Sequence, residues 1–161
     1  MIALEITGDQ ALVARLGALP GKISAAARSS LDMWANELAD YIKSDKLSGD
    51  PLHARSGTLR GSVRPIQTSE TGKISAGAGG GRNVPYAAIH EFGGLIPAHV
   101  VVAKNAQALC FTVDGVKRFA KSVQIPDVQM PERSYMRSGL RDEAPSGIAA
   151  LKEAISEAIA S

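Results

Sequence analysis

The sequence predicts one α+β domain, residues 1–161, in which a mainly antiparallel sheet is packed by a long N-terminal helix and followed by a C-terminal amphipathic helix. Three observations lead to this fold class. An apolar stripe at helical spacing runs through residues 20–46, short apolar runs broken by turn signals fill residues 58–131, and a second helical stripe follows Pro145. Helices and strands do not alternate in a βαβ rhythm, and no repeat or long linker divides the chain.

The N-terminal part is predicted to be helical after a short strand. Residues 2–7 alternate weakly between apolar and polar side chains, and residues 10–16 favour a short helix that ends at the following glycine. Pro20 suits the first turn of a helix over about residues 20–46, because proline has no N–H to leave unpaired there. Trp34 lies in the apolar stripe of this helix and is predicted to anchor the core. The stripe has spacings of 4, 4, 3, 4 and 3 and consists of Ile23, Ala27, Leu31, Trp34, Leu38 and Tyr41.

The middle of the chain is predicted to hold a hairpin, a loop and a short helix. Residues 58–67 and 73–77 have the pattern of two strands, joined through a turn at residues 69–72. The three glycines 79–81 favour a loop. Residues 85–92 carry apolar side chains at helical spacing and are followed by two glycines, so a short helix is expected there.

Tight turns and short strands are expected next. Residues 100–102 and 108–113 are apolar runs of strand length. Asp114 and Gly115 form a strong two-residue hairpin signal that leads into a strand over residues 116–119.

The last part is predicted to be extended and then helical. Residues 125–131 are marked by prolines, and a helical stretch begins at Ser134. A last amphipathic helix is expected after Pro145. Its apolar positions are Ile148, Leu151, Ile155 and Ile159.

Composition excludes several classes of protein. Hydrophobic residues make up 45% of the chain, which suits a buried core and not wholesale disorder. No stretch approaches the roughly 20 apolar residues of a membrane-spanning helix, and the N-terminus lacks the pattern of a signal peptide. We therefore expect a soluble protein made in the cytoplasm. The single cysteine, Cys110, excludes an internal disulfide and, because it lies in an apolar run, is expected to be buried.

Charge is nearly balanced overall and uneven along the chain. The net charge is +2, and aromatic residues, at 4%, are too few and too scattered to form a stacking platform for single-stranded nucleic acid. Residues 43–82 and residues 104–141 each carry seven basic and three acidic side chains, whereas the last 20 residues carry one basic and four acidic. A basic middle and acidic ends would suit charge-complementary contacts between copies. Chance asymmetry on a solvated surface is the alternative.

No catalytic, cofactor-binding or metal-binding residues are predicted. His90 and Glu91 resemble the start of a zinc-protease helix, but the second histidine that this motif needs is replaced by Gly94. The glycine-rich run at residues 77–82 lacks the Gly-Lys-Ser/Thr of a phosphate-binding loop. The serines lie in no nucleophile-elbow pattern, and nothing near Cys110 would activate its thiol.

Three sequence blocks resemble, in this order, the virion-morphogenesis or minor tail-component family of tailed bacteriophages, typified by Mu-like and related prophages. Residues 55–63 read RSGTLRGSV, residues 84–94 read VPYAAIHEFGG, and residues 120–123 and 130–140 read AKSV and MPERSYMRSGL. The ordered trio is more specific than any block alone. The residues that carry the resemblance are Arg55, Gly57, Leu59, Arg60, Tyr86, His90, Glu91, Phe92, Gly93, Gly94, Pro131, Arg133 and Tyr135.

The blocks also indicate which residues pack. Many relatives carry alanine where Gly139 stands, and glycine lowers helix propensity by roughly 1 kcal/mol, so continuity of a helix there is in question. Charged residues beside the blocks could pair within the fold or across an interface. The apolar residues expected to pack are Leu59, Val63, Tyr86, Ile89, Phe92, Tyr135 and Met136.

The resemblance implies a non-enzymatic structural protein of the phage neck or upper tail that acts in tail completion and head–tail joining. Its expected partners are further copies of itself in a ring, six being the expected number, and neighbouring neck or tail proteins, with possible non-specific contact with passing DNA. Neither a membrane nor a small-molecule substrate is implied, and no cofactor. The expected location is the virion, and the host cytoplasm during assembly.

The candidate assembly interface consists of basic residues that do not fit a core. Arg82 lies in the glycine-rich loop, and Lys117 and Arg118 lie beside the Asp114–Gly115 turn. Two other classes of function stay open: a DNA-binding or packaging-associated factor that uses the basic middle segments, and a small hydrolase.

Overall fold

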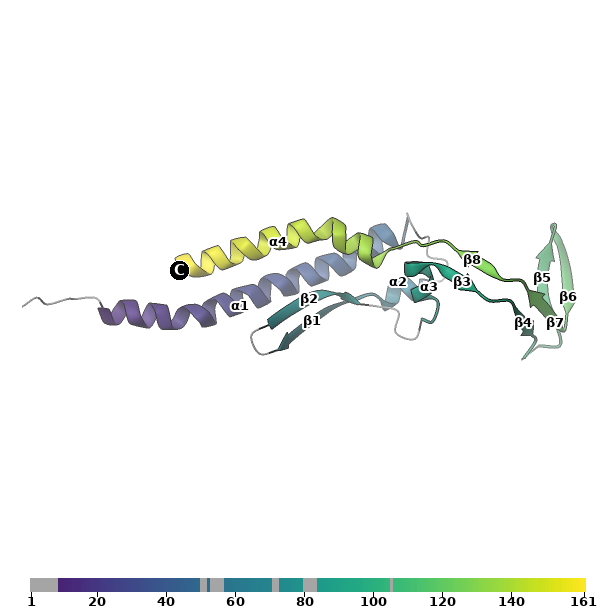
Figure 1. Ribbon diagram of the computed structural model, residues 1–161, viewed down its shortest axis with the longest axis horizontal. Helices are drawn as coiled ribbons and strands as arrows, with labels where there is room; N and C mark the ends of the chain where they lie inside the picture. The colour runs from purple at the N-terminus through teal and green to yellow at the C-terminus, as the bar shows by residue number, and fades with distance from the viewer. Residues whose placement is uncertain (1–8, 50–51, 53–56, 71–72, 80–83, 105) are drawn as a thin grey trace, which may run out of the picture. The chain divides into compact units, whose positions relative to one another are not determined.

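The computed structural model describes residues 9–49, 52, 57–70, 73–79, 84–104 and 106–161 (Figure 1). Contacts divide the chain into two compact units. The helical unit is Met1–Ala87 with Ser134–Ser161, and the ribbon unit is Ala88–Arg133. The α+β fold class is confirmed. The prediction of one domain over residues 1–161 stays a prediction.

Helix α1 is longer than the sequence indicated. It runs over Asp9–Tyr41 and continues as the π-helical turn η1, Ile42–Lys46, which confirms the helix over residues 20–46. The prediction of a separate helix over residues 10–16 is wrong, because α1 continues through Pro20. The early turns of α1 have a tertiary partner: the guanidinium of Arg15 donates to the backbone carbonyls of Ile159 and Ala160 at the far end of the chain. The strand predicted for residues 2–7 lies outside the described residues.

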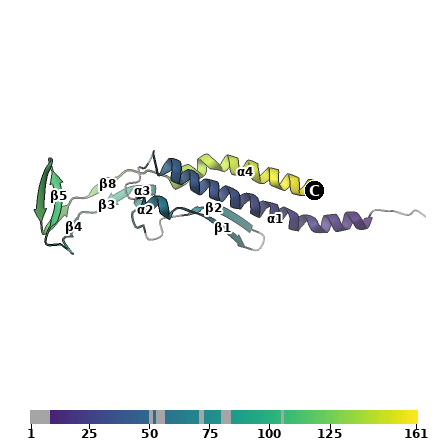
Figure 2. The ribbon, with the colours of Figure 1, turned by 180° about the vertical axis from the view of Figure 1, so that it is seen from behind.

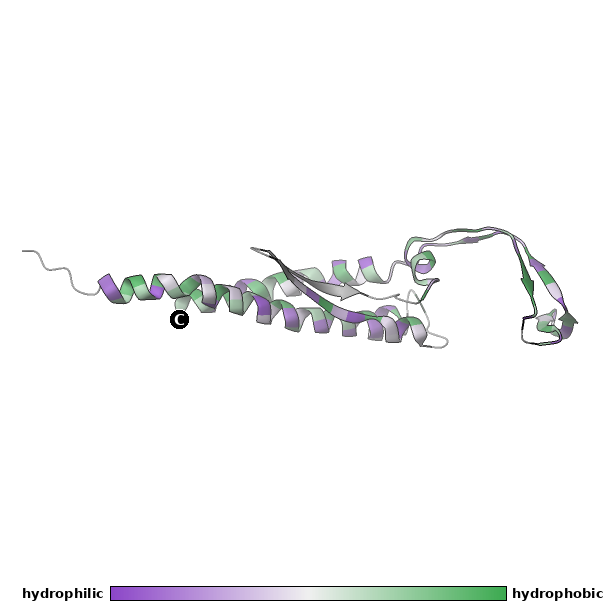
Figure 3. Cartoon of the chain, turned by 90° about the horizontal axis from the view of Figure 1, so that it is seen from below, coloured by the Kyte–Doolittle hydropathy of each residue, from purple (hydrophilic) through white to green (hydrophobic). Residues whose placement is uncertain are grey.

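Helix α4, Met136–Ala160, packs antiparallel against α1. The last helix is thus confirmed, and it is continuous with the helical stretch expected before it, since α4 runs through both Gly139 and Pro145. The packing supplies the reason: on the two sides of Pro145, Gly139 and Gly147 are both buried, against Ile42 and Trp34 respectively. Figure 3 shows both hydrophobic and hydrophilic residues along each of the two helices.

The core of the helical unit lies where α1, η1 and the start of α4 meet. Trp34 is half-buried and packs against this core, and Leu38 is among its largest fully buried side chains, so the apolar stripe predicted for residues 20–46 is confirmed. The buried cluster consists of Leu38, Ala39, Ile42, Leu47, Leu52, Val63 and Tyr135.

A hairpin lies along α1 in the same unit (Figures 1 and 2). Strand β1, Arg64–Glu70, pairs antiparallel with β2, Lys73–Gly79, with Arg64 opposite Gly79. The hairpin is confirmed, and Gly79 belongs to its second strand. The side-chain amide of Gln67 donates to the backbone carbonyl of Arg28 over 2.9 Å, which ties β1 to α1.

The first residues assigned to this hairpin are helical instead. Residues 58–62 form the short helix α2, Thr58–Ser62, and the strand prediction there is wrong. Gly57 adopts a left-handed φ of 73°, and the N–H of Gly61 donates to its carbonyl over 2.8 Å. This local turn starts α2 before the chain can extend.

Helix α3, Ala87–Phe92, forms as predicted; all of it except Ala87 belongs to the ribbon unit, which continues with strands. The strands are β3 Gly94–Ile96, β4 His99–Val102, β5 Leu109–Val113, β6 Val116–Ala120, β7 Ser122–Ile125 and β8 Val128–Met130. β3 pairs with β8, β4 with β7 and β5 with β6, all antiparallel. Together with β1–β2 they are four two-stranded ladders in the described residues, not the single sheet expected. The Asp114–Gly115 turn is confirmed, with φ values of 51° and 79° that suit a hairpin.

Candidate assembly interface

The structure brings two of the three predicted interface residues onto one strand. Lys117 and Arg118 are neighbours on β6, and both are exposed. Successive side chains of a strand point to opposite faces, so they lie on different faces of the β5–β6 hairpin. Lys117 stands opposite Thr112 of β5, and Arg118 opposite Phe111. The third residue, Arg82, lies outside the described residues.

The hairpin also exposes apolar side chains beside these charges. Phe119 is 69% exposed and stands opposite Cys110. Cys110 is exposed, so the prediction of a buried thiol is wrong. A two-stranded ladder has no second layer to cover its faces, which explains why an apolar run in this sequence does not produce burial.

The first motif block contributes to the helical unit. Leu59 packs against the buried core, and the guanidinium of Arg60 donates to the hydroxyl of Ser48 over 3.1 Å. Gly57 supplies the left-handed residue that begins α2. Arg55 lies outside the described residues. These contacts place Gly57, Leu59 and Arg60 in the local packing of the helical unit.

The second and third blocks meet in the ribbon unit. The N–H of Arg133 donates to the carbonyl of His90 over 2.9 Å. Gly93 has a φ of 66°, and a Cβ there would lie 2.7 Å from the backbone nitrogen of Glu132, which follows the exposed Pro131. The resemblance in these blocks therefore includes a close backbone approach that only glycine allows.

Burial divides the apolar motif residues into two groups. Val63 and Tyr135 are buried, Leu59 and Met136 are partly buried against the core, and Ile89 is half-buried and lies beside Gly94. Two residues that were expected to pack are exposed instead: Tyr86 is 41% and Phe92 62% exposed. Tyr86 precedes α3 and Phe92 is its last residue, whereas Ala87 and Glu91 supply the buried side chains of this helix. The charged residue next to Phe92 behaves oppositely, since Glu91 is buried.

An ion pair that the sequence did not indicate joins η1 to α4. The ammonium nitrogen of Lys46 lies 2.7 Å from a carboxylate oxygen of Asp142. This hydrogen bond is the main cause that raises the pKa of Lys46 above 10.5 and lowers the pKa of Asp142 below 3.8. The pair stabilises the folded state while both groups are charged.

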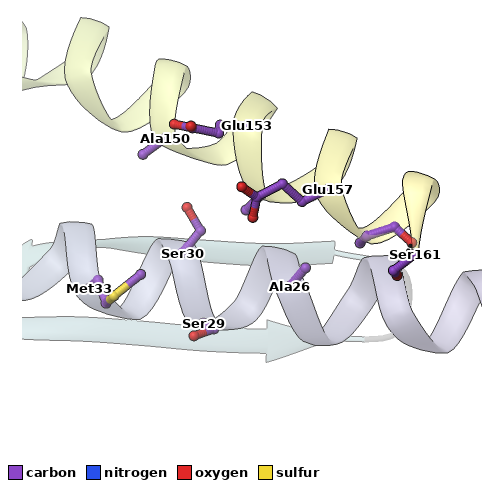
Figure 4. A pocket seen from close by; sticks show the side chains of 10 residues that line it. Ala26, Ser29, Ser30, Met33, Ala150, Glu153, Glu157 and Ser161 are labelled. Atoms are coloured by element: carbon purple, nitrogen blue, oxygen red, sulfur yellow. Dashed lines mark hydrogen bonds between the residues drawn. The ribbon is translucent and has the colours of Figure 1, made fainter.

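A groove of about 520 Å³ lies between α1 and α4, and the sequence analysis did not predict it (Figure 4). One wall carries Glu153 and Glu157, and the hydroxyl of Ser30 is directed across it towards α4. The acidic composition of the last 20 residues was the sequence feature that could have indicated the acidic wall of this groove. The lining residues are Ala26, Ser29, Ser30, Met33, Ala150, Glu153, Ala154, Glu157, Ala158 and Ser161.

Among the residues that the structure describes, no group of three or more His, Cys, Asp or Glu side chains is placed to hold a metal ion. In the same part of the chain, none of the helices combines the length and the apolar character that crossing a bilayer requires.

Comparison with known proteins identifies the family. No curated protein and no solved structure shows a significant match to this chain. Residues 22–155, which include all three motif blocks, match the phage virion morphogenesis family. Proteins of this family are of a structural or assembly kind. The match covers well over half of the sequence, and we conclude that the chain belongs to the phage virion morphogenesis family.

Proposed function

We propose that this chain is a non-enzymatic structural protein of the phage neck or upper tail that acts in tail completion and head–tail joining. The observation that carries the proposal is the match of residues 22–155 to the phage virion morphogenesis family, which supports a role in building a phage particle. Resemblance to Mu-like prophage proteins adds the expected position in the virion. The protein would be present in the host cytoplasm during assembly and in the virion afterwards.

We further propose that the protein works as a ring of copies, with six as the expected number, next to other neck or tail proteins. A closed ring needs a heterologous interface, in which one face of each copy meets a different face of the next. The chain offers two such faces: an exposed basic hairpin with Lys117 and Arg118, and a groove with Glu153 and Glu157. Their opposite charges support this arrangement.

A complementation assay tests the role. Reversing charge at Arg82, Lys117 and Arg118 should leave the purified chain folded by circular dichroism while joined, infectious particles are lost. Electron microscopy of the lysate should then show heads and tails that accumulate separately. Lys104→Glu, an exposed charge in the ribbon unit, is the matched control and should complement. Full complementation by the triple variant would remove these residues from the mechanism.

A DNA-binding or packaging-associated role is the second candidate, since Lys117 and Arg118 are exposed on a two-stranded ribbon and such ribbons can bind DNA. DNA affinity that falls steeply as salt rises would support it, because released counterions make phosphate contacts salt-dependent. Affinity at physiological salt too weak to measure would favour the structural role.

A further inference from the structure

The groove between α1 and α4 contains a buried polar group without a partner. Ser30 is 3% exposed, and its hydroxyl forms no hydrogen bond with any described residue. The hydroxyl is directed towards α4 (Figure 4). Buried hydroxyls are satisfied in most native structures, so this unpaired hydroxyl in the lining of the groove requires an explanation.

The α4 side of the groove is acidic. Glu153 and Glu157 are four residues apart on one face of α4, and both are exposed. Within the described part of the chain, neither carboxylate forms an ion pair. Like charges at this spacing repel each other, and a cation placed between them would remove the repulsion. Around them the lining is small and apolar, from Ala150 and Ala154 on α4 to Met33 on α1.

One face of the β5–β6 hairpin has the complementary chemistry. Thr112 stands opposite Lys117, and Cys110 opposite Phe119, so these four side chains share a face. All four are exposed, which gives this face a cation beside a large apolar ring. The other face carries Arg118 next to Phe111, which is half-buried. The Lys117 face is therefore the more open of the two.

We propose that the Lys117 face of the β5–β6 hairpin of one copy docks into the α1–α4 groove of a second copy. Lys117 lies between Glu153 and Glu157, Phe119 covers the small apolar lining, and the hydroxyl of Ser30 gains a hydrogen-bond partner. Each copy then donates one hairpin and receives one, which is the heterologous contact that closes a ring. This inference rests on the proposed ring of copies.

Cross-linking between two differently tagged copies tests the contact. One copy keeps the native Cys110 and carries a size tag, and the other carries Cys110→Ser with Ala150→Cys, which places a thiol in the groove. A short bismaleimide should produce a product of mixed size. Ala149→Cys is the matched control, because Ala149 is an exposed neighbour that does not line the groove. Equal yields at the two positions, or no mixed product, would overturn the proposal. The proposal would also be overturned if a chain that carries both Cys110 and Ala150→Cys cross-linked only within itself.

Charge exchange provides the second test. Lys117→Glu should weaken self-association of the full chain about tenfold in sedimentation velocity, because like charges then meet in the groove. Arg118→Glu, on the opposite face, should change it less than twofold. Adding Glu153→Lys and Glu157→Lys to Lys117→Glu should restore association. Equal effects of Lys117→Glu and Arg118→Glu, or no restoration, would contradict the docking.

The contact between two copies and the role in joining heads to tails have different tests. If the mixed product is absent but Lys117→Glu still prevents the joining of heads to tails, the hairpin contacts another virion protein. The second-copy contact is then overturned and the role in joining is retained. If the mixed product forms but a phage lacking this protein still makes joined, infectious particles, the contact is supported and the proposed function is wrong.

Discussion

The indole ring of Trp34 occupies the space that a side chain at position 147 would fill. A Cβ added to Gly147 would lie 2.5 Å from both Cε2 and Nε1 of the ring. The ring nitrogen donates to the carbonyl of Glu143 over 3.1 Å, one turn earlier on α4. A glycine that lowers helix propensity is thus the residue that lets α4 approach α1 at the tryptophan.

Gly147→Ala should destabilise the protein. Alanine favours a helix by about 1 kcal/mol, but forcing a methyl group into a packed site costs about 1–3 kcal/mol, and a large ring cannot move aside easily. We expect the free energy of unfolding in urea to fall by about 1 kcal/mol. Gly17→Ala in α1 is the control: a Cβ there has no neighbour within 4 Å, so this variant should be stabilised by up to about 1 kcal/mol. Stabilisation of both variants would show that Trp34 is not held against position 147.

Trp34→Ala should cost about 3 kcal/mol, the lower end for truncating an aromatic side chain, because Trp34 is only half-buried. Trp34→Phe retains an aromatic ring, so it should destabilise the protein less than Trp34→Ala does. The loss of the hydrogen bond to Glu143 should account for about 1 kcal/mol of its effect, and the smaller ring for the rest. Urea unfolding of both variants measures the difference. Unchanged stability in Trp34→Ala would mean that this side chain does not anchor the two helices.

The Lys46–Asp142 pair should make stability depend on pH at both ends of the scale. The pKa of Asp142 is lowered, so its contribution is complete above 3.8 and is lost as the pH falls through the folded-state pKa. The pKa of Lys46 is raised, so its contribution is complete below 10.5 and is lost as the pH rises through its folded-state pKa. Asp142→Asn should therefore be less stable than the natural chain at pH 7, and the difference should shrink at about pH 2–3. Thermal unfolding across this range checks it, with the exposed Asp32→Asn as control. A difference that persists undiminished in acid would exclude the ion pair as its cause.

Gly93→Ala should be more damaging than Gly115→Ala. Both glycines have positive φ, 66° and 79°, and an alanine costs about 1–2 kcal/mol in that region. Gly93 also approaches the backbone of Glu132, whereas a Cβ at Gly115 has no neighbour within 4 Å. Thermal unfolding should therefore show a clearly larger loss for Gly93→Ala. Equal losses would mean that only the backbone conformation, and not the close approach, requires glycine at position 93.

Features that depend on neighbouring residues followed from the sequence. The apolar stripe that contains Trp34 and Leu38 predicted a helix and its buried face, because helical period alone places these side chains together. The Asp114–Gly115 turn and the helix that ends before Gly93 were also predictable, since they depend on local backbone preferences. The three ordered motif blocks indicated the family that residues 22–155 confirm.

Features that depend on distant partners were decided by the tertiary structure. Pro20 and Pro145 would each end a helix locally, yet α1 and α4 continue through them because their packing on each other outweighs the lost hydrogen bonds. An apolar run predicted burial at Cys110, but this side chain is exposed, because burial requires a second layer that the described β5–β6 ladder does not provide. The groove with Ser30 at its floor arises only where two helices far apart in the sequence meet, and no local pattern records that meeting.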